Sequence, residues 1–239
     1  MSVSAKSQVR PARKFYVGIG ILGVVFALLG FWPGYFGPVL LQAAGKAAIL
    51  HVHAVVFVGW LALFTTQACL AANRRIDLHV AVGRLGIGYG IVVIVVGLAT
   101  GYLMSRGYAQ GGEPDRARAL LYSAIVDMGV FAPFFGAAIA LRRKPELHRR
   151  LIVVAGTSLL VAAVFRMPFL GQPRNLWLAH GIWFSPILLS MAYDYLKRRV
   201  VHPVFLAGIA ALVLQSPTFR PAVQATRTWQ SVSSWILGI

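Results

Sequence analysis

The chain has 239 residues, of which 58% are hydrophobic and only 12% charged, and its mean hydropathy is +0.72. This composition excludes a water-soluble globular domain and indicates a polytopic membrane protein. The formal net charge is +17. Because the basic residues are spread over four separate segments between apolar runs, we interpret this charge as membrane topology and expect no nucleic-acid partner.

Apolar runs of about 20 residues, the length needed to cross ~30 Å of hydrocarbon, predict the transmembrane helices. Seven runs qualify: 15–32, 47–72, 80–104, 119–141, 149–169, 176–196 and 201–217. The expected fold class is therefore all-α, a polytopic seven-span bundle over residues 15–217. A basic segment, 1–14, precedes it, and a tail, 218–239, follows it. Apolar residues at helical spacing, Trp229, Val232, Trp235 and Ile236, indicate a tail at the external membrane interface, and a disordered tail is the alternative.

Loop charges predict the orientation of the helices, since short cytoplasmic loops carry an excess of Lys and Arg. Every second connection is basic, with the residues Lys6, Arg10, Arg13 and Lys14; Arg74 and Arg75; Arg142, Arg143, Lys144, Arg149 and Arg150; Lys197, Arg198 and Arg199. We expect a cytoplasmic N-terminus and an external C-terminus in a bacterial inner (cytoplasmic) membrane. The basic segments should also contact the anionic lipids of the cytoplasmic leaflet.

Polar side chains inside the apolar runs fall into two layers when depth is assigned from a rise of ~1.5 Å per residue. The outer layer holds His51, His53, Asp127, Arg166 and His180, and the inner layer holds Gln67, His79, His148, Asp194 and His202. An ionisable group in hydrocarbon costs several kcal/mol, so each of these is expected to have a partner or a function.

Helical angle separates the two neighbouring histidines of the second run. His51 and His53 are two residues apart, so they point to different sides of a helix, and we expect His53 to face the bundle core with Trp60 and Gln67. His51 is expected in the headgroup region. Small residues share faces with the other histidines: His79 with Gly83, Gly86, Gly90, Gly97 and Gly101; His148 with Ala155, Ala162 and, at the far end, Arg166.

The first functional interpretation is binding of haem b for electron transfer across the membrane. This chemistry needs imidazoles from separate helices, small residues beside the macrocycle and arginines for the propionates. His53 and His180 would hold an outer haem with Arg166 on its propionates, and His79 and His148 an inner one. A quinone or another membrane protein would be the electron partner.

This pattern resembles the cytochrome b561 type of membrane cytochrome. The resemblance covers the four central helices and rests on one histidine per helix together with glycines; it implies two haems, each held by histidines from two helices. The chain also resembles small uncharacterised bacterial membrane proteins in which basic residues, then Leu-His, then a helix recur, as in "RRIDLH" ending at His79 and "RRKPELH" ending at His148. That resemblance implies no activity.

Other interpretations stay open. His79, His148 and His202 follow basic residues at a membrane boundary and are also explained as interfacial residues, and glycines spaced by four are also explained by helix packing. Asp127 and Arg166 are also explained as a buried ion pair. His51, His53, His180 and Asp127 are suitable ligands for zinc or iron in an enzyme that acts on lipid, although no H-x-x-x-H pair is present. A proton or transport pathway and an accessory or assembly subunit without cofactor are the remaining alternatives.

Overall fold

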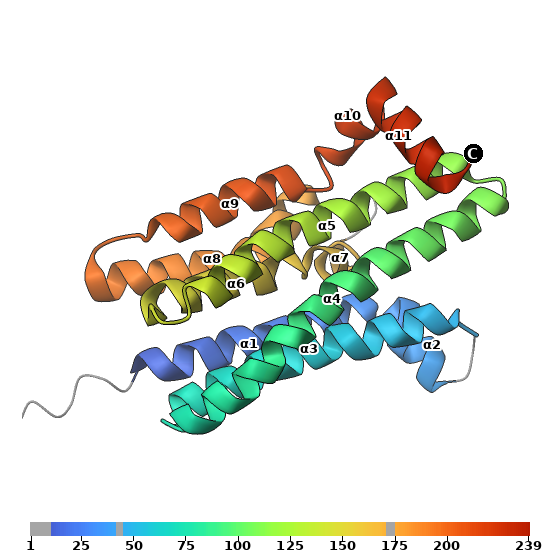
Figure 1. Cartoon of the computed structure of the whole chain (residues 1–239). Helices are drawn as coiled ribbons and strands as arrows, with labels where there is room; N and C mark the ends of the chain where they lie inside the picture. Colours follow the sequence, from blue (N-terminus) through green and yellow to red (C-terminus); the bar gives the residue numbers. More distant parts are fainter. Residues whose placement is uncertain (1–10, 42–44, 171–174) are drawn as a thin grey trace, which may run out of the picture.

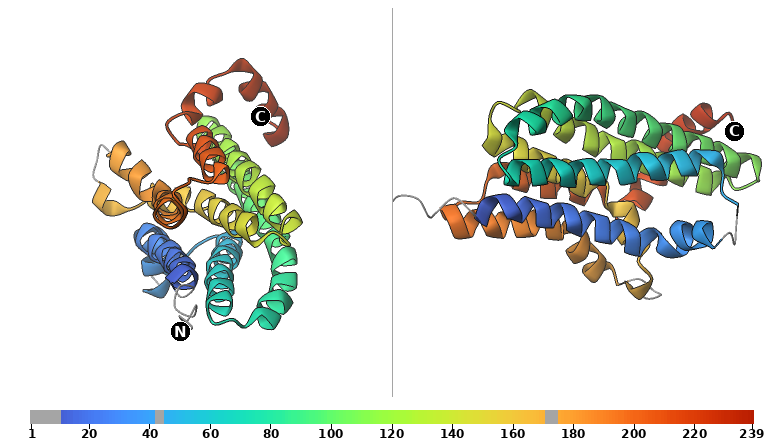
Figure 2. Two further views of the ribbon diagram at one scale, coloured as in Figure 1. Left: turned by 90° about the vertical axis from the view of Figure 1, so that its left-hand side faces the viewer. Right: turned by 90° about the horizontal axis from the view of Figure 1, so that it is seen from below.

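The computed structural model describes residues 11–41, 45–170 and 175–239, which are helical with no strand among them. The long helices run side by side along one axis, and the chain passes back and forth between the two ends of the bundle (Figure 1, Figure 2). The elements are α1 Pro11–Phe31, the π-helix η1 Trp32–Phe36, α2 Gly37–Leu40, α3 Ala48–Ala72, α4 Ile76–Gln110, α5 Pro114–Ala140, α6 Pro145–Ser158, α7 Val161–Val164, the 3-10 helix η2 Pro168–Leu170, α8 Leu176–Arg198, α9 Pro203–Gln215, α10 Arg220–Gln224 and α11 Arg227–Leu237.

Among the described residues, six helical segments are long and apolar enough to cross a membrane. They are Lys14–Leu40, Ala48–Ala72, Ile76–Gln110, Pro114–Ala140, Pro145–Val164 and Leu176–Arg198. The protein is therefore a multi-pass membrane protein, as the composition predicts. The seventh predicted run forms α9, whose 13 residues rise only about 20 Å, less than the ~30 Å of a hydrocarbon core.

The basic connections lie at one end of the bundle, which we call the basic end. The turns α3–α4, α5–α6 and α8–α9 meet there, beside the first turn of α1 (Figure 1). Lys6 and Arg10 lie outside the described residues. At the opposite end, the 35-residue α4 is about 52 Å long, so the α4–α5 hairpin extends well beyond a hydrocarbon core. Gly112 closes this hairpin with φ of +79°, a conformation that favours glycine.

Helix α6 occupies the centre of the molecule. In the segment Pro145–Val164, which α6 begins, 61% of the residues of the most apolar stretch are buried, against 6–33% in the other five segments. One face packs on α1, α7, α8 and α9 around Val154 and Trp183, and Ala155 packs with Trp60, Val93 and Phe131 from α3, α4 and α5. The residues that approach α6 therefore decide what the interior of the bundle contains.

The fifth predicted span, 149–169, is not one continuous helix. Helix α6 ends at Ser158, and α7 resumes for a single turn at Val161. The predicted alignment of His148 with Ala162 and Arg166 on one helical face was therefore wrong, because it assumed an unbroken 3.6-residue period. Hydropathy does not reveal this break, since the residues around it, Leu159, Leu160 and Val161, are all apolar.

The glycines that share a face with His79 serve helix packing in this structure. A Cβ atom at Gly90 would lie 2.2 Å from the Phe135 ring, and one at Gly97 would lie 2.6 Å from the Met128 sulfur. Gly101 faces Ala124 in the same way, so α4 and α5 approach closely along this stripe. Toward the basic end, Gly83 faces the Gln67 amide on α3.

Substituting Gly90 by alanine should destabilise the bundle, whereas the same change at Gly88 should not. Phe135 stacks on Phe131 and meets Trp60 edge-on, so its ring has little freedom to move away from a new methyl group. We expect Gly90→Ala to cost about 1–3 kcal/mol. Gly88 has nothing within 4 Å of its Cβ position, and Gly88→Ala should gain up to about 1 kcal/mol from helix propensity. Thermal unfolding in detergent compares the two variants, and equal melting temperatures would contradict the packing role.

The C-terminal tail packs against the end of the hairpin that lies farthest from the basic end. Helix α11 places Leu237 on Ala117 and Leu121 of α5, and the Trp229 indole lies 5.0 Å from the Tyr122 ring. Trp235, by contrast, is 84% exposed. The four apolar residues that predicted an interfacial helix are therefore divided between two faces, Trp229 and Ile236 toward the hairpin and Val232 and Trp235 away from it.

Candidate functional site

Two predicted inner-layer histidines, His79 on α4 and His148 on α6, have the same local arrangement. Nδ1 of His79 lies 3.2 Å from the Gln67 carbonyl oxygen of α3, and Nδ1 of His148 lies 2.8 Å from the Ala138 carbonyl oxygen of α5. A carbonyl oxygen only accepts hydrogen bonds, so Nδ1 carries the hydrogen in both neutral rings. Each imidazole is thus fixed with Nε2 as its unprotonated nitrogen.

Both rings lie near the basic end, His79 at the start of α4 and His148 at the start of α6, and both side chains are half-buried. No described residue forms a hydrogen bond to Nε2 of either ring. A carbonyl behind Nδ1 and an open Nε2 is the arrangement that orients histidines as metal ligands. The donor chemistry of His79 and His148 would therefore suit a haem iron, which these two residues would hold through their Nε2 atoms.

Gln67 holds His79 against α3. The side-chain Nε2 of Gln67 donates a 3.2 Å hydrogen bond to the backbone carbonyl oxygen of His79. The backbone carbonyl oxygen of Gln67 accepts a hydrogen bond from the His79 ring. Gly83, one turn along α4, leaves room for this amide, because a Cβ there would lie 3.0 Å from Gln67 Nε2. The reciprocal pair fixes both the register of α3 on α4 and the orientation of the imidazole.

His202 has the opposite arrangement and a structural role. Its Nδ1 accepts a 3.2 Å hydrogen bond from the Val204 backbone N–H and caps the start of α9. Burial, together with the charge of Arg150, lowers the pKa of His202 and keeps Nδ1 unprotonated. The hydrogen of this neutral ring must therefore sit on Nε2, so His202 offers no second lone pair to a metal.

The two neighbouring histidines of the predicted outer layer, His51 and His53, lie in different surroundings. His51 is exposed and shares a 2.8 Å hydrogen bond with the Tyr35 hydroxyl. His53 is half-buried and stacks on Phe57, and its buried Nδ1 has no partner among the described residues. The charge of Arg166 reaches His53, so these two predicted residues lie in one region.

His180 uses both of its ring nitrogens in hydrogen bonds. Nδ1 lies 2.6 Å from the Leu176 carbonyl oxygen, and Nε2 lies 2.6 Å from the Ser216 hydroxyl, which also contacts Thr218. No contact joins His180 to His53 in the part of the chain that the structure describes. This arrangement leaves His180 no nitrogen for an iron atom and does not provide a second pair like His79 and His148.

Asp127, halfway along α5, is bonded by residues from the end of the chain. Its Oδ1 accepts from Arg220 of α10 at 2.6 Å and from Gln215 of α9 at 2.9 Å. Arg166, the partner predicted for an ion pair, acts on the same carboxylate through its charge and donates to the Ala162 carbonyl oxygen at 2.8 Å. We call Asp127, Ser158, Gln215 and Arg220 the Asp127 cluster.

A second buried ion pair ties α6 to α8 near the basic end. Arg150 Nε lies 2.6 Å from Asp194 Oδ2, and the side chains are only 1% and 2% exposed. Arg150 also bonds the carboxylate and the backbone carbonyl of Glu146, which is paired in turn with Arg149 and Arg198. Asp194 of the predicted inner layer thus has a partner.

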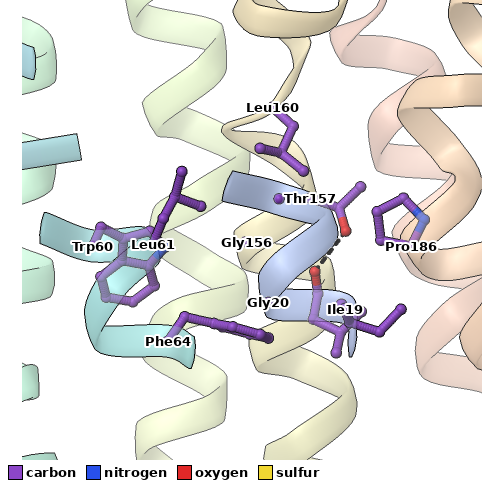
Figure 3. A pocket seen from close by; sticks show the side chains of 11 residues that line it. Ile19, Gly20, Trp60, Leu61, Phe64, Gly156, Thr157, Leu160 and Pro186 are labelled. Carbon is purple, nitrogen blue, oxygen red and sulfur yellow. Dashed lines mark hydrogen bonds between the residues drawn. The ribbon is translucent and has the colours of Figure 1, made fainter. Parts of the chain in front are cut away.

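Two cavities of the structure lie apart from the histidines that were predicted as ligands. A small apolar cavity of about 20 Å³ lies between α1, α3, α6 and α8, with Gly20, Trp60, Thr157 and Pro186 among its walls (Figure 3). A larger open cleft of about 450 Å³ is lined by Ala47, Leu103, Met104 and Tyr108 at the other end of the bundle. Neither is lined by a predicted ligand.

Neither metal-ligand geometry nor comparison with known proteins assigns a function to this site. Within the described ranges, no three His, Cys, Asp or Glu side chains come together as a metal site. No family model, curated protein or solved structure matches the chain. The functional argument therefore rests on the side chains themselves.

Three residues of these sites were missed by the sequence reasoning. Arg150 was assigned to topology alone, and Arg220 was placed in an interfacial tail. Gln215 lies at the end of the apolar run Pro203–Gln215, where it is the only polar side chain. A polar residue in such a run is a signal that could have been used. Its partner, Asp127, lies 88 positions away in sequence and could not have been predicted from such a signal.

Proposed function

We propose that this chain is a multi-pass protein of the bacterial inner membrane that holds one b-type haem between His79 and His148 and carries electrons. The observation that supports this is the shared hydrogen-bond arrangement of the two rings, each with Nδ1 on a carbonyl oxygen and Nε2 open. A haem in this position would accept and donate one electron at its iron.

The surrounding residues would each contribute to such a site. Gln67 and the Ala138 carbonyl hold the two imidazoles, so that both rings are oriented before iron binds. The adjoining basic end carries Arg75, Arg142 and Arg149, and guanidinium groups are suitable partners for propionates. An outer haem on His53 and His180 is not part of this proposal, because both nitrogens of His180 are already bonded.

The topology completes the proposal. The basic end would face the cytoplasm and its anionic lipids. We assign the seventh crossing to α9 and α10 together. Gln215 at the end of α9 bonds Asp127 in the middle of α5, and Gln224 at the end of α10 bonds the Ala119 carbonyl nearer the far end of α5. The C-terminus would then be external, and a quinone or a membrane protein would exchange electrons with the haem.

The visible spectrum of the purified chain tests the haem assignment. The protein is expressed in cells supplied with a haem precursor, purified in detergent and reduced with dithionite, and its haem is quantified as the pyridine complex. We expect a b-type α-band and one haem per chain. Two haems per chain would restore the outer pair as ligands. A flat spectrum would overturn the proposal in favour of an accessory subunit without cofactor.

A further inference from the structure

The Asp127 cluster lies where two helices end inside the bundle. Helix α6 stops at Ser158 and α9 stops at Gln215, beside the middle of the uninterrupted α5. The Gln215 side chain joins all three elements, because its Nε2 donates at 2.9 Å to Asp127 Oδ1 and at 2.9 Å to the Ser158 carbonyl oxygen. Backbone that leaves helical structure at such a depth is tolerated where protein groups or a cavity surround it.

The groups that meet in this cluster favour positive charge. The C-terminal end of a helix carries a partial negative charge, and the ends of both α6 and α9 point here. The Asp127 carboxylate adds a full negative charge. Gln215 is fully buried, and its Oε1 accepts no hydrogen bond from any described residue. The cluster thus holds more acceptors than protein donors, as interrupted helices do around cations in membrane proteins.

Arg220 supplies the positive charge from outside the bundle core. Its Nε donates to the Gln215 carbonyl oxygen at 2.9 Å and its Nη2 to Asp127 Oδ1 at 2.6 Å. It belongs to the segment 220–239, which packs mainly on the far end of the α4–α5 hairpin (Figure 1). The positive charge of Arg166 also acts on Asp127. Because Asp127 carries a single negative charge, electrostatics favours only one cation besides Arg166 at the cluster.

We propose that the Asp127 cluster is a binding site for a monovalent cation, and that Arg220 is its built-in occupant, carried on a C-terminal strap of residues 220–239. A guanidinium group fits best, because several N–H donors can reach the Asp127 carboxylate and the helix-end carbonyls together. This inference is independent of haem binding. When the Arg220 side chain is absent, a free guanidinium ion should take its place.

Chemical rescue tests the site. The full chain with Arg220→Ala is purified in detergent, and its melting temperature is measured with increasing millimolar ethylguanidinium, NaCl or choline chloride. We expect a melting temperature several degrees below that of the unmodified protein and a saturable recovery with ethylguanidinium only. Recovery with NaCl would show that the site takes an alkali-metal ion instead. The same response to all three salts would overturn the proposal.

Two further variants show whether any recovery comes from this site. Arg118→Ala removes an arginine that also bonds the strap, through Ser234 at 3.0 Å, but lies outside the cluster, and it should not respond to ethylguanidinium. Arg220→Ala with Asp127→Asn lacks the carboxylate and should not respond either. If Arg220→Ala is too unstable to purify, extraction in ethylguanidinium should restore its yield relative to extraction in choline, and equal yields would again contradict the site.

Discussion

In the proposed site, replacing His148 by alanine is expected to remove the reduced α-band and to lower the amount of bound haem severalfold. A low-spin b-type haem needs two strong ligands, and the 2.8 Å bond to the Ala138 carbonyl orients the imidazole that we propose as the second of them. His79→Ala should have the same effect. The measurement is haem per chain in protein purified from cells with the same haem supply.

Matched histidine variants separate ligation from a structural role. His202→Ala removes a half-exposed histidine at the same end of the bundle, and His180→Ala removes one from the outer layer; both should retain a full haem complement. A cavity variant, His148→Gly, should recover the α-band when haem and imidazole are added together, whereas a fold defect would not be repaired in this way. Full haem in His148→Ala would show that the ligand is a different residue.

Replacing Asp194 by asparagine is expected to cause the largest loss of stability in the chain, about 3–5 kcal/mol. The change leaves the Arg150 guanidinium, which is 1% exposed, without its closest anion. Glu146 still bonds Arg150, but its carboxylate is 45% exposed and is shared with Arg149 and Arg198. The free energy of unfolding can be measured by titration of detergent-solubilised protein with a denaturing detergent.

An apolar replacement of both partners should restore most of this loss. Arg150→Met together with Asp194→Leu removes both charges and keeps similar volumes, and such swaps are often neutral or stabilising. Asp115→Asn is the control, because Asp115 is 94% exposed and its ion pair should contribute at most about 1 kcal/mol. If Asp194→Asn and Asp115→Asn lower the free energy of unfolding by the same amount, the Arg150–Asp194 pair does not stabilise the packing of α6 on α8.

The class of the protein and most of its helices follow from local patterns in the sequence. Hydropathy and charge are properties of short stretches, so the runs that became α1, α3, α4, α5 and α8 were visible, and so was the gathering of their basic turns at one end. The face shared by His79 and the glycines was also visible, since helical angle follows from residue number. That face proved to be the contact of α4 with α3 and α5.

Which polar groups meet depends on how the helices pack in three dimensions. Asp127 and Arg220 are 93 positions apart, and Arg150 and Asp194 are 44 positions apart. Neither pairing follows from a local pattern, because an ion pair depends on distance in space. The same holds for the tautomers of His79 and His148, which are set by carbonyl groups on neighbouring helices, and for the break at Ser158, where Gln215 of α9 bonds the freed carbonyl. Hydropathy placed Asp127 and Asp194 in apolar runs, and the packing of helices distant in sequence gave them their arginine partners.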